Sequence, residues 1–578
     1  MTLTNFPSQA QPGDKNHWGE LQAAGRALAI AETALRFSGL SILITETARE
    51  AAAQSRTLAF FTAEQGLPIL TFPDWETLPY DIFSPHQDIV SARLQTLASL
   101  PSAQHALLIV PLPTLMHRLA PIDFVASRTF SYKVGEQLDR GQLQEQLARA
   151  GYNRVDTVYE HGEFAFRGSL IDIYPMGAKQ PFRIDLLDED IESLRIFDPE
   201  TQRTSETVNE IQLLPAREFP LDKQAINHFL NNWHEHFDQD AAKCPIYRDV
   251  KAGIAPQGIE YYLSLFFDQT ASLFDYLPQN VQLFSHVGIE DAAQNFWHDI
   301  NARYIEYGVD PTRPILPPKA LFLGVEEVFK HIKKLPRTEI DRQSVKPRAG
   351  SHNFNLRAVP DVAINAKLSN PLSKLQEFLQ LCPGRVLFCA ESAGRHEVLV
   401  GMLKKIQLAV EEVGNWQAFT HGDMRYAITT YPIDQGVYCP DQSLCLITEG
   451  ELFGQQVMQR RRRSKASESP DNIFKSLAEL QMGAPVVHMD HGIGQYQGLV
   501  TLEVEKSQQE FLMLVYANDA KLYVPVSSLH LISRFGGSDQ SMAPLSRLGT
   551  DKWTKAKEKA ASQIRDTAAE LLDIYARR

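Results

Sequence analysis

The feature that most restricts the fold of this chain is a series of short apolar runs in residues 485–535, PVVHMDHGIGQYQGLVTLEVEKSQQEFLMLVYANDAKLYVPVSSLHLISRF. The runs have the length and composition of strands, and glycines or polar residues stand between them. A meander this small buries little surface as an open sheet, and its edges would pair with other chains. The sequence therefore predicts a small SH3/Tudor-like β-barrel, a type of fold that usually binds a partner.

The size and charge of the chain limit what else it contains. Its 578 residues are too many for one core and predict roughly three to five domains. Hydrophobic residues make up 44% and charged residues 22%, which are ordinary globular values. The net charge of -13 argues against a large surface for the DNA backbone, because such a surface needs clustered Lys and Arg. Protein partners are therefore favoured.

The spacing of the cysteines and the length of the apolar runs indicate the cellular compartment in which the protein works. No C-x-x-C pair occurs, so neither a disulfide framework nor a zinc ribbon is predicted. No apolar run is long enough to span a bilayer, and the polar start MTLTNFPSQAQPGDKN is unlike a signal peptide. We therefore expect a cytoplasmic protein with no membrane contact. The five cysteines are Cys244, Cys382, Cys389, Cys439 and Cys445.

The first third of the chain alternates strand and helix patterns, which predicts an α/β domain with a parallel sheet. Before the strand SILIT, a nucleotide-binding domain of this type would carry a glycine-rich loop ending in Gly-Lys-Ser/Thr. Here the sequence reads AAGRALAIAETALRF, with Gly25 as its one glycine, and no G-x-x-x-x-G-K-[ST] occurs anywhere in the chain. We therefore expect no nucleotide, metal or other cofactor in these residues, and no enzyme activity.

The whole pattern predicts a multidomain α/β protein with a long C-terminal helix. The expected parts are a polar leader (1–20), a first α/β segment without a Walker A motif (21–124), an inserted α+β domain (125–214), the return segment of the first domain (215–335), a linker (336–371), a small α/β spacer domain (372–454), a linker with an arginine run (455–478), the barrel (479–548) and the helix (549–578).

Several residue groups resemble ligand sites but have simpler explanations. Two His-rich groups have spacings that do not converge on a metal, since a catalytic zinc helix needs His residues four apart. A polar group after the strand RVLFCA is explained by a helix N-cap. An arginine run is more often a solvated helix end than a DNA contact. These groups are His234, Glu235 and His236; His488, Asp490 and His491; Glu391, Ser392 and Arg395; and Arg460, Arg461, Arg462 and Arg463.

The glycines of the barrel are close to a dinucleotide-binding fingerprint but do not match it. Gly492, Gly494 and Gly498 form G-x-G-x-x-x-G, and strands stand on both sides where a helix should follow. We interpret them as positions that need positive φ or a close backbone approach.

The segments HMDHGIGQYQGL and YANDAKLYVPVSSLHLISRF resemble the RNA-polymerase-interacting module of bacterial transcription-repair coupling factors (Mfd). The resemblance extends over nearly the whole chain. LPYD and ALLIVP resemble the first motor-like domain of the excision-repair helicase UvrB, and GYNRVDTVYEHGEFAFRGSLIDIYPMGAKQPFRIDLLDEDIESLRIFD resembles the UvrA-binding domain of UvrB and Mfd. The resemblance implies a UvrB-like module with an inserted UvrA-binding domain.

The resemblance also implies which residues contact the two partners. For UvrA these are Arg167, Arg183 and Leu187, the last in place of an aromatic residue of the family. For the β subunit of RNA polymerase, we expect strand addition to the strand after the glycine turn. Its candidate contacts are Leu499, Thr501, Leu502 and Val504, with Leu502 as the expected hot spot.

The resemblance implies an adaptor in transcription-coupled repair, which binds RNA polymerase and recruits UvrA where polymerase has stalled. Displacement of the polymerase would need an ATP-driven DNA translocase, with ATP, Mg and most DNA contacts in motor domains that we do not find in these residues. Two alternatives stay open: a nucleotide-binding, helicase-like enzyme half, and a transcription regulator that acts through the barrel alone.

Overall fold

The computed structural model describes residues 11–365, 370–382, 384–453, 482–488, 491–504, 507–517, 520–525, 532–534 and 545. The chain divides into two compact units, Met1–Gln459 and Arg460–Arg578. The arginine run at 460–463, Asp490 and the helix expected at 549–578 lie outside the described residues. Within the described ranges, no helix is long and apolar enough to cross a membrane.

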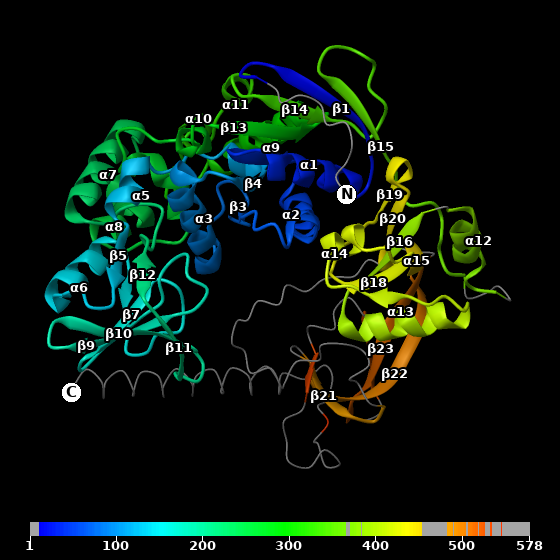
Figure 1. Cartoon of the computed structure of the whole chain (residues 1–578). Coiled ribbons are helices and arrows are strands. Elements are labelled where there is room, and N and C mark those ends of the chain that lie inside the picture. The colour runs from blue at the N-terminus through cyan, green and yellow to red at the C-terminus, as the bar shows by residue number, and fades with distance from the viewer. Residues whose placement is uncertain are drawn as a thin grey trace. The chain divides into compact units, whose positions relative to one another are not determined.

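The first unit contains a seven-stranded parallel sheet in the order β15-β1-β14-β13-β2-β4-β3. Its central strands are buried along their whole length, as expected for parallel strands between two layers of helices. Helices α1 and α2 pack on one face, and α3, α9 and α11 pack on the other (Figure 1). The elements are β1 (Lys15–Leu21), α1 (Gly25–Arg36), β2 (Leu40–Thr45), α2 (Ala48–Thr62), β3 (Ile69–Thr71), α3 (Gln87–Ser99), β4 (Ala106–Pro111), β13 (Val281–His286), α9 (Ile289–Tyr307), α11 (Val325–Ile332), β14 (Arg337–Ile340) and β15 (Ser351–Leu356).

Two segments expected to lie outside the domains belong to this sheet. The expected leader (1–20) contains most of β1, and the expected linker (336–371) contains β14 and β15, which both pair with β1. Each of these strands carries only one or two large apolar side chains, such as Trp18 and Phe354, which contact each other in the core. The prediction was wrong because backbone pairing, which has no side-chain signature, places these polar strands.

The inserted domain contains a six-stranded sheet in the order β11-β10-β9-β8-β7-β6 and the pair β12-β5. All neighbours are antiparallel except β6 and β7. One face packs on helix α6 and the core, and the other carries polar side chains, which is the usual pattern for an antiparallel sheet. The elements are β5 (Phe130–Lys133), α6 (Arg140–Arg149), β6 (Asn153–Arg154), β7 (Glu163–Arg167), β8 (Leu170–Ile173), β9 (Phe182–Leu187), β10 (Asp190–Phe197), β11 (Thr204–Val208) and β12 (Glu210–Leu213).

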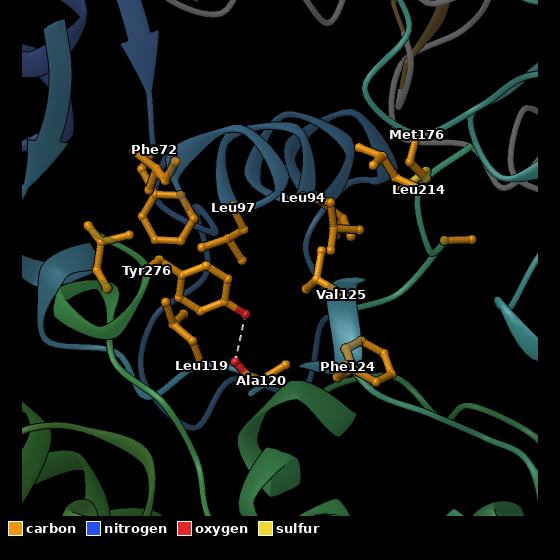
Figure 2. Close-up of a cluster of buried hydrophobic side chains, with 14 of the residues drawn as sticks. Phe72, Leu94, Leu97, Leu119, Ala120, Phe124, Val125, Met176, Leu214 and Tyr276 are labelled. Atoms are coloured by element: carbon orange, nitrogen blue, oxygen red, sulfur yellow. Dashed lines mark hydrogen bonds between the residues drawn. The ribbon is translucent and has the colours of Figure 1, made fainter. Parts of the chain in front are cut away.

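The inserted domain shares a core with the parallel sheet. Figure 2 shows Met176 and Leu214 of the inserted domain near Leu94 of α3 and Val125, all buried in one cluster. A buried ion pair lies at the same junction: Arg93 of α3 donates from Nε to Oε1 of Glu218 at 2.5 Å. The inserted domain is therefore held against the sheet by packing as well as by its two chain connections.

The return segment forms a helical cluster around buried aromatic residues. Its core includes Phe229, Trp233 and Tyr262, and Trp233 and Tyr262 stack with their ring centroids 5.8 Å apart. The elements are α7 (Lys223–His236), α8 (Pro245–Lys251) and the 3-10 helix η3 (Ile259–Phe266).

The spacer domain contains a five-stranded sheet in the order β17-β18-β16-β20-β19, parallel except for the pair β19 and β20. One face has its own core, whereas Leu387, Val437 and Leu446 on the other face share a core with α1 and α2. The elements are α12 (Ser373–Leu381), β16 (Arg385–Ala390), α13 (Ala393–Lys405), β17 (Glu411–Glu412), α14 (Trp416–His421), β18 (Tyr426–Thr430), β19 (Val437–Cys439), β20 (Leu444–Thr448) and α15 (Glu449–Phe453).

The second unit contains an antiparallel five-stranded sheet in the order β24-β23-β22-β21-β25. Strand β22 contains all three glycines, Gly492, Gly494 and Gly498, that the sequence placed between strands. Gly494 has the close approach that we predicted, because an added Cβ would lie 2.9 Å from the Tyr516 ring. Gly492 and Gly498 have the positive φ values, 81° and 117°. The elements are β21 (Pro485–His488), β22 (Gly492–Val504), β23 (Ser507–Val515), β24 (Lys521–Pro525) and β25 (Ile532–Arg534).

Candidate functional sites

The end of the parallel sheet where a nucleotide would bind is occupied by a charged cluster of this chain. Helix α1 begins at Gly25, and Arg26 and Ala27 stand where a phosphate-binding loop has Lys and Ser or Thr. Arg26 Nη2 lies 2.9 Å from Oε1 of Glu50, and His286 Nε2 lies 3.2 Å from the same oxygen. Arg26 also contacts the His286 ring. Arg26 is therefore already paired with a carboxylate.

The electrostatics of Glu50 agree with this geometry. Burial alone would raise the pKa of Glu50, but the hydrogen bond to His286 and the charge of Arg26 outweigh it and lower the pKa to about 2. Its Oε2 also accepts a hydrogen bond from the Glu46 backbone N–H at 3.1 Å. Glu50 is therefore charged at neutral pH and neutralises Arg26.

The two arginines expected to contact UvrA lie on the polar face of the six-stranded sheet. Arg183 donates from Nε and Nη2 to the two oxygens of Asp172, at 2.6 and 2.9 Å. Asp172 is completely buried, and its hydrogen bond raises the pKa of Arg183. Arg167 donates from Nη2 to the backbone carbonyl of Asp156 at 2.9 Å, and its Nη1 lies 3.9 Å from Asp172. Arg183 is thus held at a defined angle by a fork with a buried carboxylate.

The third expected contact, Leu187, ends β9 on the same face and is 64% exposed. Residues two apart on one strand share a face, so Leu187 and Arg183 point to the same side. The alternation predicts this side correctly, and the register adds that Asp172, Arg183 and Arg195 lie opposite one another on three neighbouring strands.

Arg195 of β10 is the residue that the sequence argument missed. It is exposed, lies directly opposite Arg183, and has no hydrogen bond or ion pair to any described residue. The three donors of Arg183 that form hydrogen bonds within the chain leave it less free than Arg195 for a partner. A period-two count along DIESLRIF could not have found Arg195, because the buried Ile191 and Phe197 have the same parity and the register shifts between Ile191 and Ser193.

In the second unit, the strand expected to bind polymerase has one side open. Strand β22 pairs with β21 over Gly492 to Gln495 and with β23 from Gln495 to Val504. Beyond the bulge after Tyr496, no described strand pairs with the side of β22 opposite β23. The backbone groups of this stretch that point away from β23 are therefore available for an added strand.

The register pairs the expected polymerase contacts with residues of β23. Leu499 lies opposite the buried Leu512 but is itself 45% exposed. The backbones of Thr501, Leu502 and Val504 pair with Glu510, Gln509 and Ser507 of β23. The side chains of Thr501, Leu502 and Val504 lie outside what the structure describes, so Leu499 is the described apolar contact.

Two of the other residue groups from the sequence have structural partners. Arg395 donates to the buried Glu449 at 2.6 Å, and Glu391 N–H donates to the same carboxylate at 2.9 Å. His234 contacts Tyr247, and His236 contacts the Asn232 carbonyl. No cluster of three or more His, Cys, Asp or Glu side chains in the described ranges is placed to hold a metal ion.

Comparison with known proteins gives matches in both units. The UvrB interaction domain matches residues 130–219, the MFD D3 domain matches residues 378–452, and the CarD-like/TRCF RID domain matches residues 480–536. The spacer domain thus corresponds to D3, and the sheet with the open strand to the RID domain.

Longer matches cover nearly the whole chain. The transcription-repair-coupling factor of Escherichia coli (strain K12) is 44% identical over 568 residues, which is 98% of this chain and 49% of that protein. That of Haemophilus influenzae is 40% identical over 573 residues, again 98% and 49%. That of Bacillus subtilis is 27% identical over 530 residues, which is 88% and 44%. The chain spans about half the length of the curated relatives it matches.

Proposed function

We infer that this chain, which belongs to the transcription-repair-coupling factor family, is an adaptor that binds RNA polymerase and recruits UvrA. What carries the proposal is that an UvrB interaction domain and an RID domain occur in one chain. A regulator that acts through the barrel alone would have no use for the first, so we disfavour that alternative.

The proposed UvrA contact is the polar face of the six-stranded sheet. Arg183, fixed by Asp172, and the unpaired Arg195 present two guanidinium groups that suit bidentate contact with carboxylates of the partner. Leu187 adds exposed apolar area beside them, and Arg167 extends the charged row. A flat surface with fixed arginines and one apolar anchor is typical of a protein interface with a few dominant contacts.

The proposed polymerase contact is the open side of β22, and the partner is the β subunit. Strand addition would satisfy the unpaired backbone groups after Tyr496, and Leu499 would supply side-chain specificity. We further propose that the sheet closes into an SH3/Tudor-like barrel, since β24 and β25 are the outermost strands of the pairing order and closure would remove their free edges.

We propose that these residues bind no cofactor. The alternative of a nucleotide-dependent enzyme half is disfavoured because Arg26 is paired with Glu50 and the Lys and Ser/Thr of a phosphate loop are replaced. The ATP-driven translocation on DNA that the family resemblance implies, and the displacement of stalled polymerase with it, would use ATP and Mg bound outside these residues.

Binding of the chain to the N-terminal part of the polymerase β subunit tests the first half of the proposal. We expect wild type to bind and Leu499→Arg to lose binding by at least about tenfold, since an added strand cannot pack against a charged anchor. Leu502→Arg tests the expected hot spot on the same strand. Leu381→Arg, which places arginine at another exposed leucine, is the matched control. No binding by folded wild type would refute the polymerase assignment.

Binding to UvrA tests the second half. We expect Arg183→Glu and Arg195→Glu each to weaken binding by at least about tenfold. Each variant replaces a hydrogen-bond donor by a negative charge, which would repel the carboxylates expected on UvrA. Arg149→Glu, on the exposed side of α6, is the matched control. Equal affinity for UvrA in all four proteins would place the UvrA contact elsewhere.

A further inference from the structure

The spacer domain inserts a loop at the start of helix α1, the position of the lost nucleotide site. Residues 434–436 end the connection from β18 to β19, and together with Val437, the first residue of β19, we call them the plug loop. The backbone N–H of Ala24, in the turn between β1 and α1, donates to the carbonyl of Gly436 at 3.1 Å. In a phosphate-binding loop, N–H groups at this place donate to phosphate oxygens. Here the acceptor is an oxygen of the same chain.

The space above the turn is also filled. A Cβ added at Gly25 would lie 2.7 Å from Cβ of Leu356 and 3.3 Å from Cγ2 of Val437. Val437 and Leu356 are completely buried in the core that the spacer domain shares with α1 and α2. No room for a phosphate group remains beside Gly25.

The plug loop is itself held in position. Gly436 N–H donates to Oε1 of Glu451 at 2.7 Å, and Oε2 of Glu451 accepts from the Thr448 N–H at 2.7 Å. A Cβ on Gly436 would lie 2.0 Å from the Leu446 carbonyl oxygen, so only glycine fits. At the start of the plug loop, Asp434 is paired with Arg56 of α2 at 2.9 Å. The loop therefore presents its carbonyl to α1 in one fixed arrangement.

We propose that the plug loop and Glu50 are permanent internal replacements for a nucleotide, which lock the parallel sheet and the spacer domain into one body. Glu50 replaces the phosphate charge that Arg26 would otherwise bind, and the Gly436 carbonyl replaces the phosphate oxygen. This contact between the two domains does not depend on a nucleotide. The spacer domain thus holds the parallel-sheet domain in a fixed position. This inference does not depend on whether the chain binds RNA polymerase or UvrA.

The first test restores two of the missing loop residues. In the double variant Arg26→Lys, Ala27→Thr, Gly25 is followed by Lys and Thr as in a phosphate loop. We expect the intact chain with this double substitution not to bind Mg-ATP at 1 mM. Its affinity would then be at least roughly a thousandfold weaker than that of a micromolar nucleotide site. Micromolar binding of Mg-ATP by this variant would overturn the proposal, because it would show that the site is open.

The second test measures hydrogen exchange at the Ala24 amide. We expect this amide to be protected in wild type, with no change on addition of Mg-ATP, and to exchange at least about tenfold faster in Gly436→Ala. Gly401→Ala is the matched control in the same domain, since nothing lies near an added Cβ there. Val437→Ala, which thins the plug loop without a clash, should give an intermediate rate. An Ala24 amide that is unprotected in wild type, or slowed further by Mg-ATP, would overturn the proposal.

Discussion

Two clusters in the first unit use the same chemistry and differ in what covers them. At the end of the parallel sheet, Arg26 is paired with Glu50, and on the six-stranded sheet, Arg183 is paired with Asp172. Each pair fixes an arginine with a carboxylate that is wholly or mostly buried. The side chains of both pairs are mostly buried. The first pair lies next to the core that α1 and α2 share with the spacer domain, whereas the second lies on a sheet face that also carries the exposed Arg195 and Leu187.

The difference teaches that a fixed arginine is a binding group only where a partner can reach it. Around α1, the Ala24 N–H and Arg26 Nη2 face oxygens of this chain. On the sheet face, Arg195 beside Arg183 keeps its donors free among the described residues. Pairing with a carboxylate therefore occupies Arg26 at the first site, whereas at the second it holds Arg183 in position for a partner.

The largest expected effect comes from removing the carboxylate of the exposed cluster. We expect Asp172→Ala to lower the free energy of unfolding by about 3 kcal/mol, because it leaves the mostly buried Arg183 without its counter-charge. UvrA binding should fall by at least about tenfold, since the arginine is no longer held. Denaturant unfolding and UvrA titration measure the two effects. Asp185→Ala, on the same face, is the control, and an equal loss there would show that the fork has no special role.

The sealed cluster should respond differently. We expect Glu50→Gln to lower the free energy of unfolding by about 2 kcal/mol at pH 7 and to leave UvrA binding unchanged. The pKa of Glu50 is lowered in the folded state to about 2, below its unfolded value of about 4.3. The stabilisation by Glu50 is therefore present above pH about 4.3 and is lost as the pH falls toward 2. Unfolding of wild type and variant across this range measures it. Glu32→Gln on α1 is the control, and a constant difference down to pH 2 would contradict the assignment.

A third buried carboxylate, that of Glu260, extends the comparison because no arginine among the described residues forms a two-point ion pair with it. Glu260 accepts from Ser84 Oγ at 2.7 Å, and burial, only partly opposed by this bond, raises its pKa to about 7. An acid whose pKa is higher in the folded state binds more protons there, so wild type loses stability as the pH rises from about 4.3 to 7. We expect Glu260→Gln to be more stable than wild type by about 1 kcal/mol at pH 8 and equal to it at pH 4. Thermal unfolding at the two pH values measures this, and a variant less stable at pH 8 would contradict the prediction.

The smallest expected effect is at the apolar edge of the exposed cluster. Leu187→Phe adds aromatic area at a position that is already 64% exposed, so the stability of the chain should not change. We expect UvrA binding to tighten by about threefold, as an aromatic anchor buries more surface in the partner. Titration with UvrA measures it, with Leu381→Phe as the control. A weaker complex would place Leu187 outside the contact.

The sequence predicted the broad architecture correctly because hydrophobic periodicity marks buried strands and helices wherever the side chains supply most of the burial. The multidomain α/β class follows from such patterns, whereas the close approach at Gly494 was inferred from the glycine itself. The placing of β1, β14 and β15 does not, because their neighbours supply most of the apolar surface and the strands supply mainly backbone hydrogen bonds.

The sequence alone determined that Gly25 is not followed by the residues of a phosphate loop, and that arginines at positions 167 and 183 stand on strand-like segments. Only the tertiary structure decided that Glu50, Gly436 and Val437 close the former nucleotide site, and that Arg195 lies opposite Arg183. The reason is that these contacts join residues from different elements, up to hundreds of positions apart in the chain. Their distances depend on strand register and domain packing, which no local pattern records.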